Sequence, residues 1–369
     1  MKVLLTHPFF WPHVRRGAER EVHDLGVRLR AAGDDARLMT GAPDGVLRRG
    51  AVDGLPVTWV RTPVPRVLER RGWTAPTVFG GVAAVGAALS RADLVHAFLY
   101  ADAAGVALAD RLLRRRRPLV LKLTGTVLPE RMRELRVDRE LFRRALEGAD
   151  EVWVNSRWAS EQMAGFGVPM RIVPAGLDEQ TFRPGPPRRD EPVVLCAQAP
   201  TDPRKRLVDL LDAWPAVVDA VPGAQLQLAG SAPAPVRQAL LERLPAALRS
   251  TVVFLGDLPD TALAEAYARA RVVVTPSVHE ALGLTGLEAL ACGTPVAGAR
   301  SGATPEILTA GAGALFAPLD PQDCARAIVE LLTAPTDGLV DRCRAAALPW
   351  AWPGVVTTVR ERYAALLGD

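Results

Sequence analysis

The chain has 369 residues, of which 49% are hydrophobic and 23% charged, a balance that excludes disorder as its main state and predicts two domains with separate cores. The 45 basic and 41 acidic residues give a formal net charge of +4 and are interspersed, which argues against a nucleic-acid partner. No apolar stretch is long enough for a signal peptide or a bilayer span, so we expect a cytoplasmic protein.

Two residue types are informative by their counts. The four cysteines form no C-x-x-C pair, so we expect reduced thiols and neither a disulfide framework nor a metal site. The lysines are Lys2, Lys122 and Lys205, and the other 42 basic residues are arginines. This bias is typical of a GC-rich genome, and it makes each lysine informative.

Short apolar runs alternate with helical patterns through the first half of the chain. The runs predict strands at Lys2–Thr6, Ala36–Thr40, Val57–Arg61, Leu94–Ala97, Leu119–Leu123 and Glu151–Asn155. Residues 19–32 repeat apolar side chains at helical spacing and end before Gly33, which predicts a helix. Alternating strands and helices are typical of βα units around a parallel sheet, so we expect an α/β fold.

The second half repeats this pattern. It predicts strands at Val193–Ala197, Gln225–Leu228, Val252–Leu255, Val272–Thr275, Pro295–Gly298 and Ala314–Phe316. Residues 182–192 contain four prolines and a glycine, which exclude regular structure and indicate a linker. We therefore expect two doubly wound domains, 1–182 and 193–348, facing each other across a cleft, with a linker at 183–192 and a last helix within 349–369.

One segment of the second half carries the strongest chemical signal. A predicted strand ends at Thr275, and a loop leads into a short helix whose first amides favour a phosphate: Gly283, Leu284 and Thr285. Glu280 and Glu288 bracket this anion site, and carboxylates accept hydrogen bonds from hydroxyl groups. A nucleoside diphosphate sugar offers that combination of sugar, two phosphates and ribose.

The chain resembles the retaining GT-B glycosyltransferases of family 4. Glu280 and Glu288, with Ser277 and the following Cys-Gly-Thr-Pro-Val, resemble that family's E-x7-E motif. Residues 2–20 resemble its opening strand, Gly-Gly donor-phosphate loop and first helix. Residues 93–97 resemble its strand ending in an active-site His, residues 173–184 its exit from the first domain, and residues 202–207 its donor-binding lysine turn. The last helix resembles one that crosses back to the first domain.

The resemblance implies roles for the matching residues. Glu288 would hold the ribose hydroxyls, Glu280 a hydroxyl of the transferred sugar, and Lys205 the diphosphate. The implied catalytic residues are His96, Lys205 and Glu280. The implied donor site comprises Arg16 and Gly17 of the first domain and, on the second domain, Arg204, Lys205, Leu258, Glu280, Gly283, Leu284, Thr285 and Glu288. The implied acceptor site, on the first domain, includes His13, Tyr100 and Thr124.

The residues alone leave other interpretations open. Lys205, with Arg204 and Arg206, is also compatible with a solvated helix start, and a lone His such as His96 after an apolar strand is more often a buried core residue. The chain also departs from the family. Arg16 replaces the first glycine of the Gly-Gly loop, and the arginine usual upstream of Lys205 is missing, with Arg204 as the candidate to compensate.

No D-x-D triplet occurs in the sequence, so we expect no metal, no other cofactor and a metal-independent reaction. The resemblance implies front-face transfer with retention, in which the departing phosphate helps deprotonate the acceptor. We expect a hexose or N-acetylhexosamine to move from a nucleotide diphosphate sugar, favouring UDP, to an alcohol such as a natural product, a cyclitol or a cell-envelope glycan.

Two alternatives to this enzyme stay open: a weak or inactive nucleotide-sugar-binding protein, and another GT-B-fold enzyme such as an epimerase or a phosphorylase. The run Arg114–Arg117 is typical of a solvated turn, and its alternative is contact with an anionic acceptor or peripheral contact with the inner face of a membrane. No spacing in the sequence encodes the acceptor or the oligomeric state.

Overall fold

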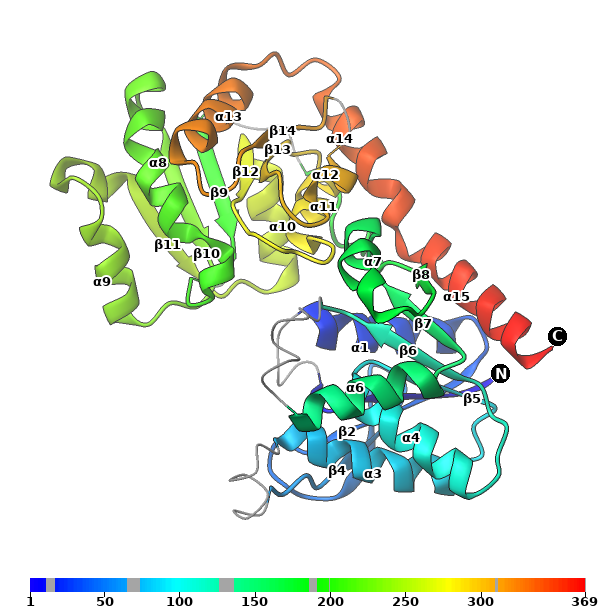
Figure 1. Cartoon of the computed structure of the whole chain (residues 1–369). Helices are drawn as coiled ribbons and strands as arrows, with labels where there is room; N and C mark the ends of the chain where they lie inside the picture. Colours follow the sequence, from blue (N-terminus) through cyan, green and yellow to red (C-terminus); the bar gives the residue numbers. More distant parts are fainter. Residues whose placement is uncertain are drawn as a thin grey trace. The chain divides into compact units, whose positions relative to one another are not determined.

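The structure is a computed structural model that describes residues 1–10, 17–64, 74–125, 136–185, 191–198, 200–308 and 311–368. The chain forms two compact units (Figure 1). The first consists of Met1–Gly176 with Pro353–Asp369, and the second of Leu177–Trp352.

The first unit is built on one sheet. Its strands are β1 (Lys2–His7), β2 (Asp35–Gly41), β3 (Arg48–Val52), β4 (Leu55–Val60), β5 (Leu94–Ala97), β6 (Leu119–Leu123), β7 (Glu151–Val154) and β8 (Met170–Ile172). Among the described residues their order is β3-β4-β2-β1-β5-β6-β7-β8, with β3 antiparallel to β4 and every other pair parallel. Every residue of β5 and β6 is buried, as expected of a parallel sheet covered on both faces.

Helices cover both faces of this sheet. They are α1 (Gly17–Ala31), α3 (Ala75–Leu89), α4 (Tyr100–Leu112), α6 (Arg136–Gly148), α7 (Arg157–Met163) and α15 (Trp352–Leu367), with the 3₁₀ turn η1 at Ala164–Phe166. Val95, Ala97 and Leu121 share a core with side chains of α3, α4 and α6. Because side chains alternate along a strand, their neighbours His96 and Lys122 point to the opposite face.

The second unit is a second doubly wound sheet. Its strands are β9 (Val193–Ala197), β10 (Gln225–Ala229), β11 (Val252–Gly256), β12 (Val272–Thr275), β13 (Val296–Ala299) and β14 (Gly313–Phe316). All its pairs are parallel, and in the described part the order is β11-β10-β9-β12-β13-β14. Its helices are α8 (Leu207–Ala220), α9 (Ala234–Glu242), α10 (Asp260–Arg269), α11 (Leu284–Ala291), α12 (Thr304–Ile307), α13 (Pro321–Thr333) and α14 (Leu339–Ala347), with 3₁₀ turns η2 (Pro203–Lys205), η3 (Ala246–Thr251) and η4 (Leu348–Trp350).

The boundary between the units lies earlier than the predicted linker. The amide of Leu177 donates to the carbonyl of Trp350, and the amide of Trp352 donates to the carbonyl of Leu177. This backbone bridge places residues 177–182 in the second unit, ahead of the proline-rich stretch at 183–192. Residues 186–190 of that stretch lie outside the described residues, so the linker itself stays a prediction.

The end of the chain returns to the first unit, as expected of the last helix. On α15, Arg360 pairs with Asp34, Arg362 pairs with Glu151 of β7, and the ring of Tyr363 stacks on Trp153. Figure 1 shows α15 in red running beside β7 and β8 of this unit.

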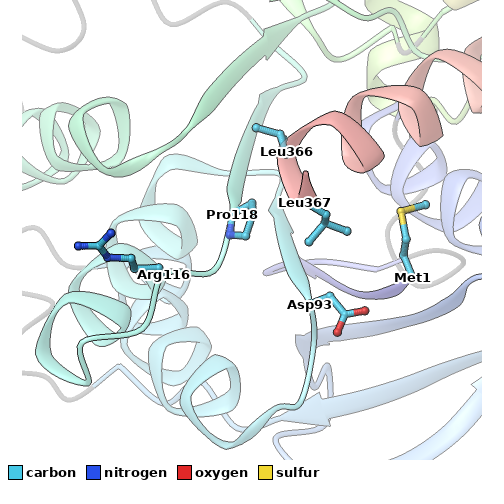
Figure 2. A pocket seen from close by; sticks show the side chains of 6 residues that line it. All are labelled: Met1, Asp93, Arg116, Pro118, Leu366 and Leu367. Carbon is cyan, nitrogen blue, oxygen red and sulfur yellow. The ribbon is translucent and has the colours of Figure 1, made fainter. Parts of the chain in front are cut away.

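A surface hollow of about 660 Å³ lies at the other end of this sheet from its carboxyl edge (Figure 2). Its lining residues are Met1, Asp93, Arg116, Pro118, Leu366 and Leu367. Because Met1, Asp93 and Pro118 come directly before β1, β5 and β6, the hollow belongs to the amino ends of the strands. Ligands of doubly wound sheets bind at the carboxyl ends of the strands, so this hollow is not where a ligand of such a sheet is expected.

Candidate functional site

The second sheet reverses its strand order between β9 and β12, which is where ligands of such sheets bind. Gln198 follows β9 and Ser277 follows β12, and the Ser277 hydroxyl donates to Oε1 of Gln198 at 2.8 Å. Both side chains are buried. This hydrogen bond joins the segments that follow the carboxyl ends of the two strands, at the candidate site.

Backbone hydrogen bonds fix the lysine turn, residues 202–207, to the loop after β12. Asp202 begins η2 by accepting a hydrogen bond from the amide of Arg204 at 3.0 Å. The amide of Val278 donates to the carbonyl of Arg204 at 2.9 Å, which joins the turn to the loop after β12. Nζ of Lys205 forms an ion pair with Oε1 of Glu280, and each side chain is about a quarter exposed. The structure therefore brings these two predicted residues together.

The position of Glu280 depends on a close approach of backbone. The amide of Ala303 donates to the carbonyl of Glu280 at 2.9 Å. Gly302 has a φ of +61°, and a Cβ there would lie 2.4 Å from the Glu280 carbonyl oxygen. Only glycine accommodates both requirements, so the loop between β13 and α12 fixes the loop that carries Glu280.

Helix α11 begins where the sequence places it. Gly283 precedes it with a φ of +94°, and the amides of Gly286 and Leu287 return to the Gly283 carbonyl. The first amides of the helix, those of Leu284 and Thr285, have no acceptor within α11 and point out of its positive end. In the second turn, Glu288 is buried and Oε2 accepts a hydrogen bond from the Tyr267 hydroxyl at 3.2 Å. Leu258, half-buried after β11, lies at the same sheet edge.

Two family models match the chain. The glycosyl transferase 4-like domain matches residues 16–176, and the glycosyl transferases group 1 model matches residues 191–334. Each of the two units therefore matches a glycosyl transferase family model. This confirms the family indicated by the motifs around Glu280 and Glu288.

Curated relatives in this family match part of the chain. A GDP-mannose-dependent alpha-(1-6)-phosphatidylinositol dimannoside mannosyltransferase of Mycobacterium tuberculosis is 33% identical over 226 residues, which are 58% of this chain and 57% of that protein. A sulfoquinovosyl transferase of Arabidopsis thaliana is 30% identical over 211 residues, 54% of this chain and 40% of that protein. The match thus spans little more than half of the mycobacterial relative and less than half of the Arabidopsis relative.

Solved structures match the whole chain. A sucrose-phosphate synthase from Thermosynechococcus elongatus has a TM-score of 0.82 at 23% identity, covering 100% of this chain and 99% of that one. An Anabaena protein solved in complex with UDP and glucose has a TM-score of 0.77 at 21% identity, covering 99% of each chain. These likenesses confirm the predicted GT-B fold class, with its two Rossmann-like domains.

His96, for which the family resemblance implies a catalytic role, is a buried residue of the first unit. It is 1% exposed, its Nδ1 is hydrogen-bonded at 2.6 Å to the Tyr363 hydroxyl, and its ring stacks on Phe98. Burial, with a smaller contribution from the nearby Lys122 charge, holds the pKa of His96 well below its ordinary value. His96 lies on the strand face covered by α15, as the alternative of a core histidine expects, and its catalytic role stays a prediction.

The structure also describes four of the six other residues that the resemblance implies for the donor and acceptor sites. Arg16 and His13 lie outside the described residues, and Gly17 is the first residue of α1. Tyr100 and Thr124 follow β5 and β6, where the Tyr100 hydroxyl donates to Asp138 and the Thr124 carbonyl accepts from Asn155. The Arg204 guanidinium forms two hydrogen bonds with Asp202 and is 66% exposed, so the structure engages it away from Lys205.

Sequence reasoning missed two buried polar pairs in the first unit. Lys122 of β6 pairs with Glu21 of α1, and Nζ also donates to the Val173 carbonyl. The Thr6 hydroxyl donates to Oδ2 of Asp102 at 2.5 Å. The signal for Lys122 was present, because it is a rare lysine within an otherwise apolar run, whereas no local pattern marks Asp102.

No helix among the described residues combines the length and the apolar character that crossing a membrane requires. No group of three or more His, Cys, Asp or Glu side chains is arranged there to hold a metal ion.

Proposed function

We propose that this protein transfers a hexose or an N-acetylhexosamine from a nucleoside diphosphate sugar to an alcohol, with retention of configuration and without a metal. The observation that carries the proposal is the cluster at the β9–β12 reversal. There, Lys205 forms an ion pair with Glu280. The loop that follows Glu280 leads into the amino end of α11, and α11 carries Glu288.

The charges of this cluster suit such a donor. The diphosphate takes Lys205 from Glu280 and lies against the first amides of α11, where a cation and a helix dipole stabilise the charge that develops on the leaving phosphate. Glu280, once released, accepts from a hydroxyl of the sugar, and Glu288 accepts from the ribose. The pair seen between Lys205 and Glu280 therefore exchanges partners when the donor binds.

The choice of nucleotide is the finer part of the proposal. The sequence resemblance favours UDP, whereas the mycobacterial relatives are named as GDP-mannose-dependent. We place GDP-mannose first because these relatives match at 30–33% identity, above the identity of the UDP-bound structural neighbours.

The test is nucleotide release from GDP-mannose, UDP-glucose, UDP-N-acetylglucosamine and TDP-glucose, without acceptor and with EDTA. Lys205→Met and Glu288→Gln should each lower release from the preferred donor on the order of 100-fold. Lys2→Met and Glu265→Gln, both at exposed positions, should leave release unchanged. Binding of a donor without release, even after an acceptor screen, would favour the inactive binding protein, and failure to bind any donor would refute the proposal.

The stereochemical outcome has its own readout. With the preferred donor and an acceptor found by screening, proton NMR of the product should show the anomeric configuration of the donor. An inverted product would refute retention without refuting transfer.

We also propose peripheral contact with an anionic membrane surface. Residues 111–116, with the sequence Arg-Leu-Leu-Arg-Arg-Arg, are all exposed, and Leu112 is 73% exposed. Leu89, which is 81% exposed, ends α3 beside them, because Arg115 and Arg117 both donate to the carbonyl of Ala87. Exposed leucines among arginines match the chemistry of an anionic lipid interface.

A further inference from the structure

Tyr267 is a buried side chain whose hydroxyl faces the candidate site. It belongs to α10, which packs against α11, and its side chain is fully buried. Its hydroxyl oxygen lies 3.2 Å from Oε2 of Glu288. Its own carbonyl accepts from the Thr294 hydroxyl at 2.6 Å, and its ring is tilted against Phe182 with centroids 6.0 Å apart. These contacts fix both the backbone and the ring.

The hydroxyl can only act as a donor to Glu288. Burial and the neighbouring carboxylate raise the pKa of Tyr267 well above its ordinary value, so its proton stays in place at neutral pH. A buried carboxylate is costly without hydrogen bonds, and this one receives a bond at Oε2. The bond fixes the plane of the carboxylate, whose two oxygens can together accept about four hydrogen bonds.

We propose that Tyr267 is a positioning residue that aims the Glu288 carboxylate at the ribose diol and thereby makes the protein select ribonucleotides over deoxyribonucleotides. This inference rests on the proposed function, because it assigns the ribose to Glu288. Tyr267 itself is too deeply buried to touch the ligand, so its whole effect passes through Glu288.

The test compares Tyr267→Phe with wild type, both as the 369-residue chain, using calorimetric titration with GDP and with 2′,3′-dideoxy-GDP. If the donor screen selects UDP, the uridine pair replaces them. Wild type should bind GDP on the order of 100-fold more tightly, because the dideoxy nucleotide loses two hydrogen bonds to a charged group. Tyr267→Phe should weaken GDP binding about tenfold and change dideoxy-GDP binding by less than about twofold.

Kinetics with the intact donor give a second readout. Because the ribose does not react, its contacts are the same in the ground state and in the transition state. Tyr267→Phe should therefore raise KM about tenfold and leave kcat within about twofold. Tyr363→Phe is the matched control, since it removes another fully buried tyrosine hydroxyl, the one bonded to His96 in the first unit, and should leave nucleotide binding unchanged.

The outcomes separate this inference from the proposed function. An equal loss for GDP and dideoxy-GDP would show that Tyr267 only supports the fold, and no loss for GDP would show that it does not position Glu288. Either result overturns the inference while nucleotide binding stands. Failure of wild type to bind GDP and UDP would refute the proposed function, and the inference with it.

Discussion

The buried pair between Lys122 and Glu21 yields the sharpest prediction about the first unit. Nζ of Lys122 lies 3.2 Å from Oε1 of Glu21, and the side chains are 1% and 6% exposed. Burial raises the pKa of Glu21 and lowers that of Lys122, while each partner opposes the effect on the other. Removing one partner therefore leaves a charge that folding must neutralise.

The cost of neutralising sets the magnitude. In Glu21→Gln, Lys122 has to lose its proton at pH 7, about 3.5 units below its ordinary pKa of 10.5, which costs about 5 kcal/mol of unfolding free energy. In Lys122→Met, Glu21 has to gain a proton about 2.5 units above its ordinary pKa of 4.5, which costs about 3 kcal/mol. Both values agree with the roughly 3–5 kcal/mol lost when a buried pair is broken.

The two variants should respond to pH in opposite directions. In Glu21→Gln the folded protein holds fewer protons than the unfolded chain, because Lys122 is neutral only when folded, so the loss of stability shrinks as pH rises from 7 to 9. In Lys122→Met the folded protein holds more protons, because Glu21 is protonated only when folded, so the loss shrinks as pH falls from 7 to 5.

Urea unfolding at pH 5, 7 and 9 measures these differences. Because the chain has two units, hydrogen exchange of peptides from α1 and β6 assigns the loss to the first unit. Glu147→Gln, which removes a carboxylate from an exposed pair with Arg143, is the control and should not shift the unfolding curve. Slopes of the same sign in both variants, or a loss below about 1 kcal/mol in both, would refute the reasoning.

Two further predictions concern the same unit. Burial raises the pKa of Asp102 to about 8 from its ordinary 3.8, so between these values the folded protein keeps a proton that the unfolded chain releases, and stability falls as pH rises. Urea midpoints should therefore drop more from pH 5 to pH 8 in wild type than in Asp102→Asn, and equal drops would contradict the assignment. Vesicles of phosphatidylglycerol and phosphatidylcholine should sediment wild type at low salt, and Arg114→Gln with Arg116→Gln should weaken this about 30-fold at about 1 kcal/mol per arginine. Arg237→Gln with Arg269→Gln removes the same charge from exposed positions of the second unit and should have no effect; equal weakening would show mere net-charge attraction.

The clearest strand predictions from the sequence are the apolar runs that are buried on both faces. Apolar runs such as Val272–Thr275 and Leu119–Leu123 have little alternative to the interior of a parallel sheet, and both appear there. The strands missed were β3 and β8, whose residues are mostly exposed and lie at the sheet edges. The edge strands β11 and β14 of the second sheet were predicted because they keep an apolar run, whereas β3 and β8 are defined by backbone pairing and have no such run.

The site divides in the same way. The loop before α11 could be predicted because its glycine, its helix start and its carboxylates are neighbours in sequence. Tyr267 lies 21 residues from Glu288 and their contact depends on how α10 packs on α11. His96 shows what a motif alone leaves open. The motif placed His96 at a strand end, but its contact with Tyr363 depends on how α15 packs on the sheet.

In this arginine-rich chain, one lysine in each unit, Lys122 and Lys205, forms an ion pair with a glutamate. Inside β6 a guanidinium would bring five donors into an apolar strand, whereas the Lys122 ammonium is satisfied by one carboxylate and one carbonyl. At the lysine turn, the proposed function has the compact ammonium of Lys205 leave Glu280 for a diphosphate, whereas the planar guanidinium of Arg204 is held by two bonds to Asp202. Lysine therefore suits the two places for different reasons: a small number of donors in the core and, in the proposed function, an exchangeable partner at the lysine turn.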